Sequence, residues 1–166
     1  MKASTQLRIV PAPISTEPVF YEQTWDLKYR HALGKTVGGF LEALRHRQLL
    51  GRLCPSCDRV LFPARSFCDR CHTETTDWVA VGTTGVLSMF TIVYEPFPGM
   101  LVDAPYVLCY AELEGADTAA VGYLRGLDLT DPAEATKLIY TGAPIRVVFT
   151  DHPEGKVTDF WFELVN

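Results

Sequence analysis

The sequence contains no apolar run that is long enough to cross a membrane. A membrane-spanning helix needs about 20 consecutive, mainly apolar residues, and this chain of 166 residues, although 48% hydrophobic, interrupts its apolar stretches well before that length. Its first residues, MKASTQLRIVPAPISTEP, have no continuous apolar segment of the kind found in a secretory signal. These absences predict a cytoplasmic protein without a membrane anchor, in a reducing environment.

The sequence also lacks the patterns that mark common catalytic sites. It shows no Ser-His-Asp set, no paired acidic motif and no glycine-rich loop that would hold a phosphate. Internal repeats and low-complexity tracts are absent as well. Any chemistry in which the chain takes part is therefore expected to come from a partner.

Cysteine is scarce, but four of the five cysteines lie within one short stretch, CPSCDRVLFPARSFCDRC. They form two Cys-x-x-Cys pairs, Cys54 with Cys57 and Cys68 with Cys71. Two such turns can present four thiolates to one Zn²⁺ ion, with Zn–S distances of about 2.3 Å, whereas disulfides are rare in reducing compartments. The spacing therefore predicts a zinc ribbon with one structural Zn²⁺ bound by these four residues. A pair of disulfides or a redox Cys-x-x-Cys site is the alternative.

The fifth cysteine, Cys109, lies in the stretch YVLCYAEL, which alternates like a strand. Val107, Cys109 and Ala111 share one face of that strand, which predicts a buried thiol. A nucleophilic cysteine needs an activating base, and no histidine lies nearby in the sequence. Burial is the favoured interpretation, and a nucleophilic role is the alternative.

Hydrophobic periodicity divides the chain into four predicted segments. Residues 1–19 are expected to be an extended arm, residues 20–51 a helical docking segment, residues 52–77 the zinc ribbon and residues 78–166 a β-barrel. The predicted fold class is α+β and mainly β, with N-terminal helices, a four-cysteine ribbon and a C-terminal five-stranded barrel of the OB type.

Two helices are expected before the ribbon. Tyr21, Trp25, Tyr29 and Leu33 recur at every fourth residue and would form an aromatic stripe along one helical face. The stripe either packs on the rest of the chain or docks onto another protein. A glycine-rich stretch, residues 34–39, is expected to interrupt the pattern, and a second helix is predicted over FLEALRHRQLL, ending near Gly51.

After the ribbon the sequence alternates with the period of a strand. Residues 79–94, 106–113, 118–124, 144–151 and 157–164 are predicted strands, and residues 130–138 form a helix or a loop between them. Five short strands in a segment of this length are typical of a small Greek-key barrel.

Charge is divided unevenly along the chain. Residues 1–77 contain 11 Lys and Arg against 8 Asp and Glu, whereas residues 78–166 contain 4 against 12, a net charge of −8. A ribbon next to an OB barrel suggests nucleic acid, but this negative charge would repel a phosphate backbone. Binding of nucleic acid is therefore the alternative hypothesis. Arginines around the ribbon either bind phosphate groups or only solvate it, and they are Arg45, Arg47, Arg52, Arg59, Arg65 and Arg70.

The order of these motifs resembles a known family, the bacterial and archaeal zinc-ribbon plus OB-fold proteins that accompany acyl-CoA enzymes. The resemblance covers residues 20–163 and is carried by FLEALRHRQLLGRLCPSCDRVLFPARSFCDRCH, GTTGVLSMFTIVYEPFPGMLVDAPYVLCYAELEG and GAPIRVVFTDHPEGKVTDFWFEL. Ala64 is a departure, because many relatives have a second proline at this position.

This resemblance implies a non-catalytic subunit in a hetero-oligomer. The partners of such proteins are thiolases, lipid-transfer-protein-like thiolases and aldolases, or MaoC-like hydratases, which act in pathways such as lipid or steroid degradation. Their helices and ribbon contact the partner, and the ribbon and barrel help to enclose the CoA part of the substrate. The expected function is thus that of an accessory subunit of a thiolase or retro-aldolase that acts on an acyl-CoA ester.

The resemblance also assigns roles to residues that the patterns alone leave open. The stripe of Tyr21, Trp25, Tyr29 and Leu33 becomes the candidate docking face, and Arg52 and Arg65 become candidates for contacts with the CoA phosphates. Two alternatives from other classes stay open: a nucleic-acid-binding module, and an acyl-CoA enzyme in its own right that uses Cys109.

Overall fold

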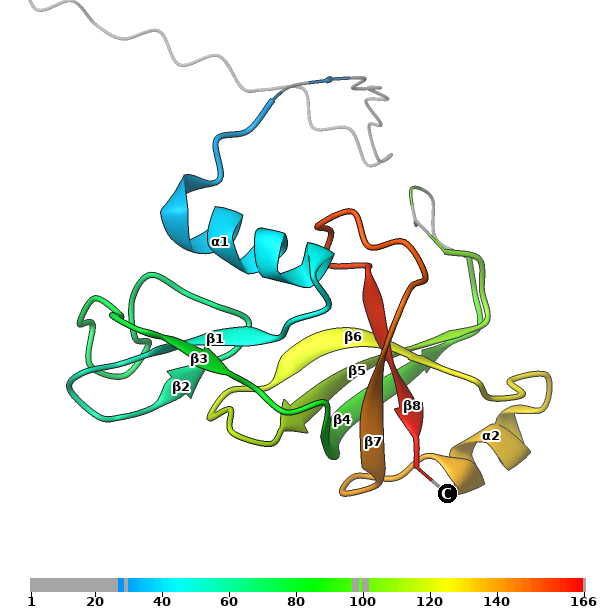
Figure 1. The fold of residues 1–166 in the computed structure, drawn as a ribbon. Helices are drawn as coiled ribbons and strands as arrows, with labels where there is room; N and C mark the ends of the chain where they lie inside the picture. The colour runs from blue at the N-terminus through cyan, green and yellow to red at the C-terminus, as the bar shows by residue number, and fades with distance from the viewer. Residues whose placement is uncertain (1–26, 29, 97–98, 100–101, 166) are drawn as a thin grey trace, which may run out of the picture. The chain divides into compact units, whose positions relative to one another are not determined.

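The computed structural model describes residues 27–28, 30–96, 99 and 102–165. The described residues from Ala32 onward form one structural unit, which contains helix α1, a three-stranded sheet and a five-stranded barrel (Figure 1). The predicted fold class, α+β and mainly β, is confirmed. Neither described helix, α1 with 12 residues or α2 with 7, is long and apolar enough to span a bilayer.

Helix α1, Gly34–Arg45, begins before the predicted start at Phe40 and ends before the predicted end near Gly51. The glycines that were expected to interrupt the helical pattern lie inside the helix. Gly39 is required there because the indole of Trp78 packs against it, and a Cβ at Gly39 would lie 2.7 Å from Trp78 Cζ2. The helix buries one apolar face, made of Phe40, Ala43 and Leu44.

The two neighbouring glycines of α1 allow a matched pair of substitutions with opposite expected effects. In Gly38→Ala the added Cβ meets no atom within 4 Å outside its own helix, so its better helix propensity should stabilise the fold by about 0.5–1 kcal/mol. Gly39→Ala pushes on the Trp78 ring and should cost about 1–3 kcal/mol. Thermal unfolding followed by circular dichroism should therefore give a higher Tm for the first variant and a lower Tm for the second. Shifts of the same sign would contradict this packing.

The first predicted helix is wrong over the part of it that the structure describes. Residues 27, 28 and 30–33 are not helical. Gly34 has a φ of +69°, outside the right-handed helical region, so α1 cannot continue backwards through Leu33. Leu33 is instead the residue that precedes α1, and it is 46% exposed. Tyr21, Trp25 and Tyr29 lie outside the described residues, and their docking role stays a prediction.

The ribbon is built on a small antiparallel sheet with the strand order β2-β1-β3. Its strands are β1 (Leu50–Leu53), β2 (Val60–Leu61) and β3 (Trp78–Ala80). The first Cys-x-x-Cys pair lies in the connection from β1 to β2, and the second lies in the connection from β2 to β3. Because β1 pairs with both other strands, the sheet brings the two connections together.

The barrel closes in the order β4-β5-β6-β8-β7 (Figure 1). Strand β7 pairs with β4 and closes the barrel, while β6 and β8 pair in parallel. Helix α2, Pro132–Leu138, lies between β6 and β7, and the carboxylate of Asp131 caps it. This topology confirms the predicted OB type. The strands are β4 (Thr84–Val93), β5 (Tyr106–Leu113), β6 (Ala120–Arg125), β7 (Pro144–Phe149) and β8 (Phe160–Leu164).

One predicted strand, residues 79–94, is in fact two strands in two sheets. Its first residues belong to β3 of the ribbon, and the rest forms β4 of the barrel. Gly82 lies at the break, where its N–H donates to the carbonyl of Glu114 at 2.8 Å. The alternation of apolar residues continues across the break, so the sequence pattern alone did not reveal it.

One large cluster of buried apolar residues extends through the helix, the ribbon and the barrel. The rings of Phe40 in α1 and Phe62 after β2 meet edge to face, with their centroids 5.7 Å apart. Both belong to the same cluster of buried residues as Leu87, Val107 and Phe162 of the barrel strands. The apolar face of α1 is therefore used inside the chain and is not free to meet a partner.

Candidate metal site

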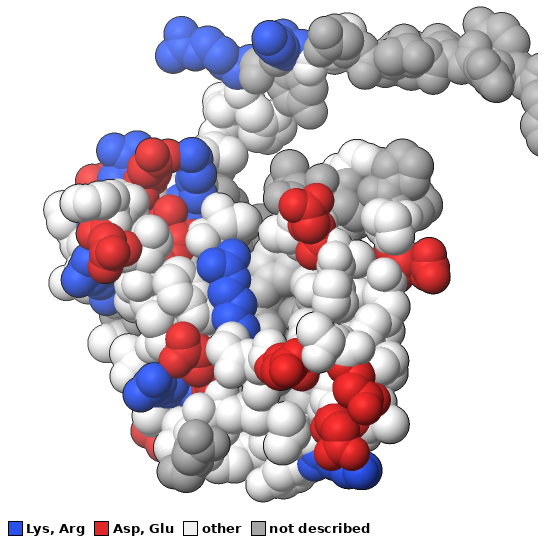
Figure 2. Space-filling view, turned by 90° about the vertical axis from the view of Figure 1, so that its right-hand side faces the viewer, with Lys and Arg blue, Asp and Glu red and all other residues white. Residues whose placement is uncertain are grey.

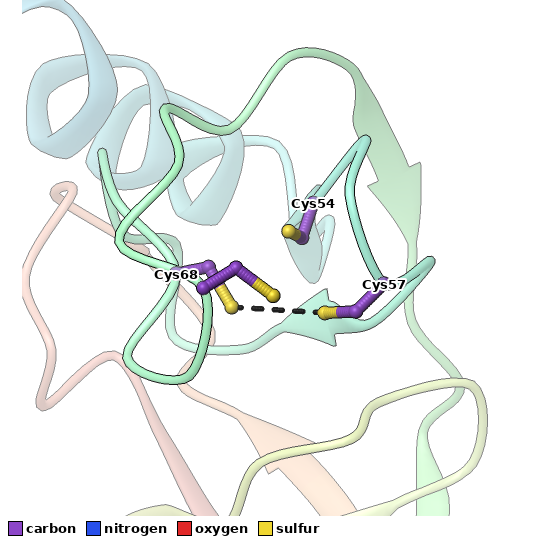
Figure 3. Close-up of side chains that lie close together, drawn as sticks. Cys54, Cys57 and Cys68 are labelled. Carbon is purple, nitrogen blue, oxygen red and sulfur yellow. Dashed lines mark hydrogen bonds between the residues drawn. The ribbon is translucent and has the colours of Figure 1, made fainter.

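The four cysteines of the two Cys-x-x-Cys pairs come together at one point. Their Sγ atoms all lie within 4.8 Å of one another, and those of Cys57 and Cys68 are 3.8 Å apart (Figure 3). A tetrahedral ion with bonds of about 2.3 Å would place its sulfur ligands about 3.8 Å apart. Cys54, Cys57, Cys68 and Cys71 are thus positioned to hold a metal ion.

The disulfide alternative does not agree with this geometry. All five cysteines are free, and the 3.8 Å separation of Cys57 Sγ and Cys68 Sγ is far longer than the S–S bond of about 2.05 Å in a disulfide. The labelled side chains in Figure 3 reach into the same space from two loops. The arrangement fits a single ion and leaves no open coordination position among the four sulfur atoms.

Both metal-binding loops use the same backbone geometry. The N–H of Asp58 donates to the carbonyl of Cys54 at 2.9 Å, and the N–H of His72 donates to the carbonyl of Cys68 at 3.0 Å. Asp58 has a φ of 57° and His72 a φ of 54°, a left-handed conformation that Asp and His tolerate better than most residues. These two residues, which directly follow the second cysteine of each pair, shape the loops. Sequence reasoning had assigned them no such role.

The thiols of Cys68 and Cys57 have different pKa values, in part because of backbone hydrogen bonds to their sulfur atoms. The N–H groups of Cys71 and Arg70 donate to the sulfur of Cys68 and lower its pKa to about 6. The N–H of Arg59 lowers the pKa of Cys57, but burial and hydrogen bonds with the other three thiols raise it to about 12. A metal ion entering the site must therefore displace protons that the thiols share.

An ion pair connects the two loops beside the sulfur atoms. Arg59 Nη1 lies 2.7 Å from Asp69 Oδ1, and Arg65 Nη1 lies 3.8 Å from Asp69 Oδ2. The hydrogen bond from Arg59 holds the pKa of Asp69 below its usual value, and the same bond raises the pKa of Arg59. The side chain of Arg59 is only 18% exposed, whereas that of Arg65 is 47% exposed.

The two arginines predicted to contact CoA phosphates differ in how far the fold engages them. Arg52 donates from Nη2 to the carbonyl of Thr75 at 2.7 Å, and its guanidinium lies 4.9 Å above the ring of Trp78. The hydroxyl of the buried Thr75 donates to the carbonyl of Arg65 at 2.7 Å. Thr75 thus links the Arg52 side chain to the Arg65 backbone. Among the described residues, the Arg65 side chain is paired only with Asp69, at 3.8 Å.

Two family models match adjacent parts of the sequence. The ChsH2 rubredoxin-like zinc ribbon domain matches residues 41–77, and the ChsH2 C-terminal OB-fold domain matches residues 78–150. Together they cover about two thirds of the chain, in the same order as the ribbon and barrel of the structure. The chain belongs to the ChsH2 family. The family resemblance inferred from the sequence is therefore confirmed.

Two solved structures share the fold of this chain. The chain has 23% identity and a TM-score of 0.61 to a chain of the Ltp2-ChsH2(DUF35) aldolase, covering 81% of this chain and 98% of that one. With a DUF35-family protein of unknown function from Sulfolobus solfataricus, the values are 18% identity and a TM-score of 0.54, over 76% and 83% of the two chains. A comparison with curated proteins found no match.

Cys109 lies apart from the four-cysteine site, inside the barrel. Its side chain is 1% exposed, and its thiol donates to the carbonyl of Gly122 at 3.4 Å. Burial raises the pKa of Cys109 to about 12, so very little of the reactive thiolate is present at neutral pH. The structure agrees with the interpretation of Cys109 as a small buried apolar residue.

Proposed function

We propose that this ChsH2-family protein is a non-catalytic accessory subunit of an acyl-CoA carbon–carbon bond enzyme of the retro-aldolase type, in a cytoplasmic hetero-oligomer. The observation that carries the proposal is the pairing of ChsH2 ribbon and OB-fold domains on the fold that occurs in the Ltp2-ChsH2 aldolase. An aldolase-type partner is preferred over a thiolase because one of the similar solved chains comes from the Ltp2-ChsH2(DUF35) aldolase.

The arrangement of reactive groups supports a role without chemistry of its own. Among the residues that the structure describes, the cluster of side chains suited to a metal is the four-cysteine set, which is closed to substrate. We propose Zn²⁺ as its ion, since four thiolates in a reducing compartment favour zinc or iron and the proposed role needs no redox change. Elemental analysis of protein purified without chelator tests this choice.

Attachment to the catalytic partner is proposed to use the aromatic residues before α1. Aromatic side chains at interfaces commonly cost about 2 kcal/mol or more on truncation, so Trp25→Ala should weaken partner binding by roughly 30-fold. Pull-down and titration with the aldolase-type subunit that co-purifies with the wild type would measure this. Tyr140→Ala is the control, because Tyr140 is 58% exposed beside α2. Metal content and circular dichroism should remain unchanged in both variants.

A second apolar surface makes the docking experiment decisive. Met89, Tyr110 and Val121 are direct cross-strand neighbours on β4, β5 and β6, and they are 62%, 46% and 49% exposed. If Trp25→Ala binds the partner normally and Tyr110→Ala does not, the partner docks on the barrel, and the proposed attachment through the N-terminal segment is wrong.

Enclosure of the CoA ester is proposed to involve Arg65. A hydrogen bond from guanidinium to phosphate contributes about 1.5–3 kcal/mol, so Arg65→Ala should raise the KM for the acyl-CoA substrate at least about tenfold. The kcat of the complex should change little, because the contact would be the same in the ground state and the transition state. Steady-state kinetics of the reconstituted complex measures both constants.

Arg70→Ala serves as the control for Arg65→Ala, since the Arg70 side chain is exposed on the same ribbon and forms no hydrogen bond or ion pair with any described residue. Arg52→Ala should raise the KM as well, but it also removes the contacts with Thr75 and Trp78 and should lower the Tm. An unchanged KM in the Arg52 and Arg65 variants would mean that neither residue contacts CoA.

The two other hypotheses make different predictions. On the face shown in Figure 2, Asp and Glu side chains lie among the Lys and Arg side chains without a broad basic patch, which does not favour a nucleic-acid backbone. Salt-sensitive binding of single-stranded DNA or RNA, without any effect of CoA esters, would support that hypothesis instead. Loss of activity in a Cys109→Ala complex would support an enzyme that uses its own cysteine.

A further inference from the structure

Arg59 differs from Arg65 and Arg70, the exposed arginines of the ribbon, in its burial and its contacts. It directly follows the first metal-binding loop, and its carbonyl accepts the N–H of Cys54 at 2.8 Å. Its side chain is 18% exposed, and its guanidinium uses both terminal nitrogens in hydrogen bonds. Burial and fixed geometry of this kind are not needed for an arginine that only solvates the surface.

The guanidinium of Arg59 joins three parts of the chain. Nη1 donates to Oδ1 of Asp69, the residue after the first cysteine of the second loop, at 2.7 Å. Nη2 donates to the carbonyl of Asp117, in the turn between β5 and β6, at 3.1 Å. Asp117 in turn accepts the N–H of Val60 on its carboxylate at 2.8 Å and donates its own N–H to the Val60 carbonyl at 2.8 Å. One side chain thus connects both metal-binding loops to the barrel.

The charge of Arg59 also matters to the sulfur atoms. Asp69 Oδ1 lies 3.9 Å from Cys68 Sγ, so an unpaired carboxylate there would repel a thiolate. Four thiolates around a divalent ion leave a net charge of about −2 at the site, which makes a nearby cation favourable and a nearby anion unfavourable. By pairing with Asp69, Arg59 removes the net negative charge that this carboxylate would otherwise place beside the sulfur atoms.

We propose that Arg59 is a positioning residue of the metal site, which holds the two cysteine loops at the spacing that the ion needs and neutralises the carboxylate beside Cys68. This inference rests on the proposed metal at the four cysteines and is independent of the acyl-CoA role. Groups that orient metal ligands typically affect metal affinity by about 10- to 100-fold. Arg59 should have an effect of that size although it is not a ligand.

The test is a zinc competition titration of the full chain against a chromophoric chelator. Arg59→Met should weaken zinc binding by about 10- to 100-fold. Arg59→Lys keeps the charge but cannot donate to Asp69 and Asp117 from two separate nitrogens, so its zinc affinity should lie between those of Arg59→Met and the wild type. Arg70→Met, on the same ribbon with an exposed side chain, should stay within about threefold of the wild type. Charge-transfer spectra of the Co²⁺ forms should show altered thiolate geometry only in the Arg59 variants.

Asp69→Asn tests separately whether Arg59 acts by neutralising the carboxylate. If Arg59 acts partly by neutralising Asp69, then Arg59→Met combined with Asp69→Asn should bind zinc more tightly than Arg59→Met alone. Equal zinc affinity of the wild type, Arg59→Met and Arg70→Met would overturn the proposal. A wild-type chain that binds no metal would instead contradict the metal site itself. If Arg59→Met fails to fold even with zinc, Arg59→Lys decides the question: weaker zinc binding than the wild type supports the proposal, and equal binding overturns it.

Discussion

Replacing Cys54 by serine is expected to reduce the metal content from about one ion per chain to nearly none, and to unfold the ribbon. The ribbon's own buried cluster consists of Cys54, Leu61 and Cys68, so two of its three buried residues are proposed metal ligands. Structural zinc contributes on the order of 10 kcal/mol of apparent folding free energy in small zinc peptides, and a ribbon with so little core cannot replace that contribution. Elemental analysis and co-purification with the catalytic partner should show loss of metal and of assembly together.

The barrel should be affected less than the ribbon by Cys54→Ser. The barrel would lose the packing of Phe62, which belongs to the shared core. It would also lose the hydrogen bonds that the Phe62 N–H and carbonyl form with the hydroxyl of Thr118. Cys109→Ala is the matched control, since it removes a buried thiol outside the metal site and should keep a full complement of metal. A Cys54→Ser protein that retains one ion per chain would exclude the four-cysteine site. Iron in place of zinc would correct the ion and leave the ligands as proposed.

Gly85→Ala is expected to be the most destabilising of the glycine substitutions considered for this chain. A Cβ at Gly85 would lie 2.1 Å from the carbonyl oxygen of Glu112 and 2.8 Å from Cα of Leu113. These are backbone atoms, and Gly85 pairs with both Leu113 of β5 and Ile145 of β7, so neither side can move away without opening the barrel. The cost should be about 3 kcal/mol or more.

Thermal unfolding measures this cost directly. For a chain of this length, a loss of 3 kcal/mol corresponds to a fall in Tm of roughly 10 °C. Gly38→Ala, for which no such contact exists, is the control and should raise the Tm slightly. A Gly85→Ala protein whose Tm lies within a degree or two of the wild type would mean that β4 and β5 do not approach each other as closely as this.

The features that the sequence predicted well depend on local patterns. The four cysteines follow from spacing within one short segment, and the barrel strands follow from alternation within each strand. Helix α1 was misplaced because Gly39 has poor helix propensity, and its reason for being there is the ring of Trp78, which is distant in the sequence. The special position of Arg59 among six arginines depends on Asp117, 58 residues away. No local pattern reveals a contact of that range.

The closure of the barrel has a consequence for the order in which the chain folds. Strands β4 and β7 meet through pairs such as Thr84 with Arg146, about 60 residues apart, and such distant pairings form slowly. The pairing of Arg52 with Leu61 in the ribbon spans only a short loop, and we expect it to form before β7 leaves the ribosome. We expect zinc capture to precede barrel closure. In a cell short of zinc, the nascent chain would then expose the unpaired edge of β4 for longer, and strand-to-strand aggregation would compete with assembly.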